Sequence, residues 1–132
     1  SPRLEELKRL NSATGSEDAS IRAIQEVQVR FLMAAAGAGV IELRMEEADL
    51  RESLKSQEGE MRRSMQMSAL SGSAYTYQAF SDADITAYAD ALEHPKMQRV
   101  YELMNAVQFE IMANRYEAVA DRMRSLRPSQ DL

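Results

Sequence analysis

The sequence predicts an all-α fold: a single domain of five or six helices that ends in a helical hairpin with a long last helix. Three observations support this class. Apolar residues recur every three or four positions along most of the chain. Alanine and methionine are frequent, and aromatic residues make up only 6%, which favours helix over sheet. No run of four or more residues alternates between apolar and polar side chains, so no strand is expected.

The length of 132 residues fits one domain. We expect this helical domain to cover residues 1–127 and a polar tail to follow over residues 128–132. The chain begins without Met, which suggests a mature form or part of a longer precursor, and no signal peptide is present in it. The longest apolar run, residues 31–41, is well short of the roughly 20 residues that span a membrane, so no membrane-spanning segment is expected.

The first helix is predicted from leucines that recur at threes between Pro2 and Gly15. These are Leu4, Leu7 and Leu10. Ser16 is the expected cap of a second helix that runs into residues 31–41. Because that run is apolar on all sides, it is predicted to be the most buried part of the chain.

Residues 42–63 are highly charged and predict one kinked helix or two shorter ones, with the break at Gly59. Ion pairs are expected between an acidic residue and the arginine four positions later, and they should keep the outer helix faces in water. They are Glu26–Arg30, Glu47–Arg51 and Glu58–Arg62. Residues 68–78 are small and polar, and either continue the helix poorly or form a loop.

The clearest local signal lies around residue 81. Ser81 is an expected N-cap with Asp84 at the reciprocal position, and Phe80 and Ile85 are placed to form a hydrophobic staple around it. The helix that follows should stop before Pro95, which suits the first turn of the last helix. The stripe predicted to be buried on that last helix comprises Met97, Val100, Tyr101, Met104, Val107, Ile111, Val119, Met123 and Leu126.

Composition excludes several classes of function. Without cysteine there are no disulfides, thiolate metal sites or thiol nucleophiles. A single histidine excludes sites that need two imidazoles, and a net charge of −5 does not favour nucleic acid. No phosphate loop, dinucleotide-binding motif or nucleophile elbow occurs. We therefore expect no cofactor, no metal and no nucleic acid partner.

Three groups of residues remain as candidates for function. His94 could act as a general base beside Asp90 and Glu93, but its place before Pro95 is more typical of a helix cap or a corner. An acidic group on residues 42–52 could bind a hard cation, but its arginines favour a solvated face. The methionines lie at helical spacing, which is typical of a core. An adaptable binding face and a thioether copper site are the alternatives. The face we single out comprises Met61, Met65, Met97, Tyr101 and Met104.

Residues 80–100 also carry a family resemblance. Phe80 precedes the capped pair Asp84-Ile85, and His94-Pro95-Lys96-Met97 opens the next helix. This order resembles a family of small, exported, all-helical bacterial domains catalogued as domain of unknown function 2059. That family usually has Glu-Leu at the capped pair and Ser-Pro-x-Gly at the helix start. The resemblance implies a helical fold and a periplasmic or exported location, and it implies no activity.

The sequence therefore leaves three functional hypotheses. The first is a non-enzymatic interaction module of the bacterial envelope that binds a protein partner or forms a homo-oligomer. The second is a carrier that holds a lipid or small apolar ligand between its helices. The third is an enzyme of unknown class around His94.

Overall fold

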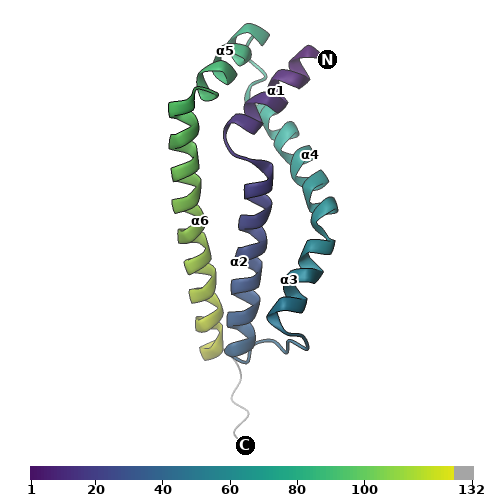
Figure 1. The fold of residues 1–132 in the computed structure, drawn as a ribbon, viewed down its shortest axis with the longest axis vertical. Helices are drawn as coiled ribbons and strands as arrows, with labels where there is room; N and C mark the ends of the chain where they lie inside the picture. Colours follow the sequence, from purple (N-terminus) through teal and green to yellow (C-terminus); the bar gives the residue numbers. More distant parts are fainter. Residues whose placement is uncertain (127–132) are drawn as a thin grey trace, which may run out of the picture. The chain divides into compact units, whose positions relative to one another are not determined.

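The computed structural model describes residues 1–126, which form six α-helices and one short 3-10 helix and contain no strand (Figure 1). The helices are α1 (Pro2–Ala13), α2 (Glu17–Gly37), α3 (Glu47–Ser56), α4 (Glu58–Thr76), α5 (Asp82–Leu92), α6 (Pro95–Met123) and the 3-10 helix η1 (Arg124–Leu126). The all-α class is confirmed, as is the long last helix of 29 residues. The polar tail expected at residues 128–132 lies outside the described residues.

The chain divides into two compact units. The first contains Ser1–Ile21 and Glu58–Ala106, and the second contains Arg22–Gln57 and the chain from Val107 onward. Both α2 and α6 therefore contribute residues to each unit. The assignment of residues 1–127 to a single domain stays a prediction. No helix in the described part of the chain combines the length and apolar character that crossing a membrane requires.

The core of the first unit lies where α1 packs against α5 (Figure 1). Both helices present apolar side chains at three- and four-residue spacing, so each forms one continuous stripe. The buried residues are Leu7, Leu10 and Ala13 from α1 and Ile85, Ala89 and Leu92 from α5. Partly buried residues of α4, α6 and the segment after α4 pack around this cluster, namely Leu70, Met97, Tyr101 and Tyr77.

Arginines of α1 border this core and bind α5 through ion pairs. Arg9 donates to both carboxylate oxygens of Glu93, at 2.8 Å each, and also to Asp90 and Glu6. The hydrogen bond from Arg9 lowers the pKa of Glu93, and the positive charge adds to this effect, while desolvation and the neighbouring Asp90 oppose it. Arg3 donates to Asp82 at 2.6 Å and to two backbone carbonyls after α4.

The predicted caps and helix starts around Ser16, Ser81 and Pro95 are confirmed. Ser81 and Asp84 form a reciprocal capping box at the start of α5. Pro95 is the first residue of α6, and two residues separate it from the end of α5. The Ser16 hydroxyl accepts from the Ala19 N–H at the start of α2, at 3.3 Å. The half-exposed Phe80 ring packs edge-on against Tyr77, and its staple with Ile85 stays a prediction.

The second unit places part of α2 between α3 and part of α6 (Figure 1). The Gln25 amide of α2 donates to the Leu54 carbonyl of α3 at 3.2 Å. On the other side, the rings of Phe31 in α2 and Tyr116 in α6 meet edge to face, with centroids 6.0 Å apart. The buried side chains of this unit are mostly small, namely Val27, Val29, Ala35, Ala38, Leu50, Ala113 and Ala120.

Two predictions about burial are wrong. Within residues 31–41 only Ala35 and Ala38 are buried, and Ile41 is exposed. The stripe expected to be buried on α6 is also largely exposed at its large apolar positions. The reason is that α6 buries Ala113 and Ala120, whose small side chains allow close helix packing, and leaves its larger side chains on other faces.

The charged stretch forms two helices, but their boundary differs from the prediction. The helix begins at Glu47 rather than near residue 42, and the break falls at Gln57, while Gly59 lies inside α4. The small polar residues that follow continue the helix as far as Thr76. All three predicted acid-first pairs form, at 3.5, 3.0 and 3.1 Å in chain order.

The core of the first unit can be tested by truncation. Because Leu10 is 2% exposed, Leu10→Ala should lower the free energy of unfolding by about 2–5 kcal/mol, measured by urea denaturation. Leu126→Ala is the control, since Leu126 is 81% exposed and its truncation should cost no more than about 0.5 kcal/mol. Equal losses in the two variants would contradict the assigned core.

The Arg9–Glu93 contact predicts that the stability of the fold depends on pH. The pKa of Glu93 lies below its ordinary value of 4.5, so the stability that this carboxylate contributes is complete above pH 4.5 and is lost as the pH falls through the folded-state pKa. In urea midpoints measured between pH 3 and 7, Glu93→Gln should be less stable than wild type near neutrality and approach it in acid. The exposed Glu60→Gln is the control, and the same convergence there would contradict the assignment.

Candidate functional site

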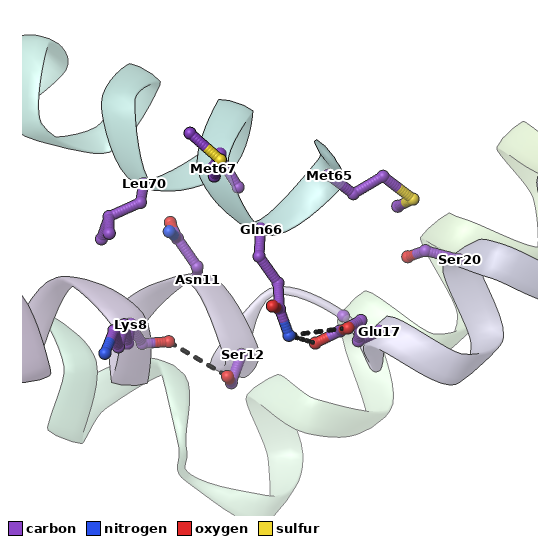
Figure 2. A pocket seen from close by; sticks show the side chains of 11 residues that line it. Lys8, Asn11, Ser12, Glu17, Ser20, Met65, Gln66, Met67 and Leu70 are labelled. Atoms are coloured by element: carbon purple, nitrogen blue, oxygen red, sulfur yellow. Dashed lines mark hydrogen bonds between the residues drawn. The ribbon is translucent and has the colours of Figure 1, made fainter. Parts of the chain in front are cut away.

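A groove of about 510 Å³ lies within the first unit between α1, the start of α2 and α4 (Figure 2). Its volume falls within the range of sites for small molecules, which is roughly 300–1,000 Å³. The residues that line it are Lys8, Asn11, Ser12, Gly15, Glu17, Ser20, Met65, Gln66, Met67, Ala69 and Leu70.

Hydrogen bonds between helices hold the polar wall of the groove. Gln66 of α4 donates to both carboxylate oxygens of Glu17, at 2.9 and 3.0 Å (Figure 2). Arg62, one helical turn earlier, binds the same carboxylate at 3.1 Å. Ser73 of α4 donates to the Asn11 side-chain oxygen of α1. The groove is therefore positioned by contacts between segments that lie far apart in the sequence.

The apolar part of the groove lining comes from α4. Met65, Met67 and Leu70 supply two flexible thioethers and one branched side chain (Figure 2). Thioether side chains adapt to ligands of varied shape. Chemically, the groove can hold an apolar group against Met65, Met67 and Leu70 while its amide and hydroxyl groups hydrogen-bond a polar part of the same molecule.

The second candidate surface is a run of exposed apolar residues on α6, which we call the α6 stripe. It comprises Val100, Leu103, Met104, Val107 and Ile111, whose exposed fractions range from 44 to 60%. These positions are three or four residues apart on one continuous helix, so they share one face of it. Isolated exposed apolar residues are common, whereas a contiguous exposed set is a candidate surface for contact with another molecule.

The methionine face predicted from the sequence is split between these surfaces. Met65 lines the groove, and Met104 belongs to the α6 stripe. Met97 and Tyr101 pack instead against the core of the first unit, and Met61 is half-buried on α4. The five residues therefore do not form one surface. A shared helical period does not specify which neighbouring element each residue will meet.

Residue identity alone does not reveal the groove. Asn11, Gln66 and Glu17 have ordinary polar helix positions, and only the pairing of α1 with α4 brings them together. On α6, Leu103 was not singled out, and Val107 and Ile111 were expected to be buried. The periodic signal for the α6 stripe is present in the sequence, but periodicity does not distinguish a buried face from an exposed one.

The residues predicted for the helix corner have structural contacts. His94 is exposed, and its Nδ1 accepts a hydrogen bond from the Lys96 N–H at 3.1 Å, so it caps α6. Ser81 and Asp84 cap α5. His94 does not line the groove.

The acidic residues near α3 are solvated, as predicted. Glu42 pairs with Arg44, and Glu47 pairs with Arg51. Arg51 also binds Glu26 at 2.7 Å, and this contact lowers the pKa of Glu26. Across residues 1–126, no three acidic or histidine side chains converge in a geometry that could hold a metal ion.

No family model, curated protein or solved structure matches this chain. The resemblance of residues 80–100 to domain of unknown function 2059 therefore stays a prediction.

The capping role of His94 predicts that replacing this residue lowers the stability of the fold. His94→Ala removes the acceptor for the Lys96 N–H, and should lower the free energy of unfolding by about 0.5–2 kcal/mol. His94→Asn supplies another good N-cap acceptor and should recover most of that loss in thermal or urea unfolding. A stability loss that asparagine does not recover would argue against capping.

Proposed function

We propose that this protein is a non-enzymatic helical interaction module that associates with a second copy of itself through the α6 stripe. The observation that carries the proposal is the run of half-exposed apolar residues on α6. Burying such side chains against a partner removes apolar surface from water, which is the main driving force of protein association. An envelope location rests only on the resemblance in residues 80–100.

A second copy suits the α6 stripe for a physical reason. In a two-fold dimer the same patch meets itself, so a patch without charge at its centre contacts an equally uncharged patch. The α6 stripe meets this condition, because its five residues are all aliphatic or thioether side chains. The net charge of −5 on each chain opposes the approach of two copies and is screened by salt. Association should therefore strengthen as ionic strength rises.

The groove supports a second candidate function, a carrier for a small molecule. Its volume of about 510 Å³ and its methionine wall support this alternative. The two functions differ in one measurement. Native mass spectrometry of a carrier should show a 14.9 kDa chain with an added mass, whereas self-association should give twice that mass with nothing added. An enzyme around His94 is the third candidate.

A charge placed in the α6 stripe should prevent association. We expect Val107→Asp to shift the protein from dimer to monomer in native mass spectrometry and in light scattering at matched concentration, because the interface would bury an unpaired carboxylate. Ala106→Asp is the matched control, since it adds the same charge at an adjacent exposed position about 100° away around the helix.

Two results would contradict the proposal. One is a wild-type protein that stays monomeric at high salt and high concentration. The other is a control variant that loses association as fully as Val107→Asp. Circular dichroism of both variants checks that the helices remain folded.

A further inference from the structure

All the sulfur atoms of this chain are in methionine side chains. The chain has nine methionines and no cysteine. The described structure leaves them unequally exposed: Met67 is 72% exposed and Met104 is 55% exposed. Met45 and Met112 are exposed to a smaller extent, and the other five are partly buried. Oxidation of thioethers by a soluble oxidant should therefore begin at Met67 and Met104.

We propose that Met104 is a reversible oxidation site, and that oxidation of its sulfur and self-association through the α6 stripe exclude each other. This inference rests on the proposed function. To that function it adds a modification that would control the interface, the oxidation of Met104, and the class of oxidant, a peroxide.

The chemistry is a two-electron oxidation. The Met104 thioether sulfur uses a lone pair to attack one oxygen of hydrogen peroxide, so a sulfur–oxygen bond forms as the oxygen–oxygen bond breaks. The proton on the transferred oxygen passes to the departing hydroxide. The products are methionine sulfoxide and water, and no other reactant is needed. Methionine sulfoxide reductases reverse the reaction.

Met104 lies where a sulfoxide would weaken association through the α6 stripe. It lies within one helical turn of Val100 and Val107, and two turns before Ile111 on the same face. A sulfoxide would place a polar oxygen in the centre of this apolar surface. Burying that oxygen without a hydrogen-bond donor opposes association, and each copy of a dimer would carry one. We expect oxidised protein to associate about tenfold more weakly or worse.

Coupling between two events is reciprocal, so association must also protect Met104. Met67 provides an internal standard, because it is more exposed than Met104 and lies on a different helix, α4, where it lines the groove. The ratio of the two oxidation rates within one sample therefore reports on burial of Met104. It does not depend on the amount of peroxide added.

The experiment treats the full chain with hydrogen peroxide over a range of protein concentrations, quenches the reaction and locates sulfoxides by peptide mass mapping. When the protein is dilute, Met67 and Met104 should both oxidise readily. When the dimer dominates, oxidation of Met104 should slow by about fivefold or more while that of Met67 is unchanged. A Met104 rate that does not change with dimer formation would overturn the inference.

Two variants separate the sites. Met104→Leu keeps an apolar side chain of similar size and removes the sulfur, so its association, compared before and after treatment, should no longer weaken on exposure to peroxide. Met67→Leu should associate as wild type and keep the peroxide response. Native mass spectrometry before and after treatment provides the readout, and a sulfoxide reductase should restore the dimer in wild type.

The failures of the two proposals are distinguishable. If untreated wild type never dimerises, the proposed function fails and this inference falls with it. If untreated protein dimerises through the α6 stripe and the form oxidised at Met104 dimerises equally well, only this inference fails.

Discussion

The packing of α1 against α5 is the contact on which the first unit depends, because it joins the start of the chain to a helix far along the sequence. Arg9 and Glu93 are 84 positions apart in the sequence, and closing a loop of that length costs conformational entropy. The burial of apolar side chains from both helices offsets this cost. The ion pairs of Arg9 and Arg3 then specify which residues of the two segments lie opposite each other.

Other features of the first unit follow from this contact. The Gln98 amide near the start of α6 donates to carbonyls at the ends of both helices, those of Ala13 at 2.8 Å and Leu92 at 2.6 Å. Met97 packs against the same core. The groove also has one wall on α1, so its shape depends on α1 being held in place. Loss of the core would therefore affect the start of α6 and the groove together.

The distribution of side-chain sizes on α6 explains why this helix exposes large apolar side chains. Its buried positions in the second unit are alanines, which bury little apolar area but permit close approach. Most of its larger aliphatic side chains are exposed, and burying them against a second copy would remove their apolar area from water. The same exposure makes Met104 accessible to oxidants. The proposed interface and its proposed control thus have a common physical origin.

The sequence by itself determined much of the local structure. Helix caps and acid–base pairs involve residues three or four positions apart, so Ser81, Asp84 and Pro95 were assigned correctly without knowledge of any neighbouring helix. The all-α class followed from the same short-range periodicity. Burial could not be assigned in the same way, because it depends on which helix faces meet. Residues 31–41 show that an apolar run does not necessarily lie in the core.

Only the tertiary structure decided where the candidate surfaces lie. The groove exists because α1 and α4 pair, and the α6 stripe is exposed because α6 packs through other residues, Met97 and Tyr101 in the first unit and Ala113 and Ala120 in the second. Both outcomes depend on contacts between residues far apart in the chain. Periodicity can show that residues share a helix face, but it carries no information about the partner that covers that face or leaves it bare.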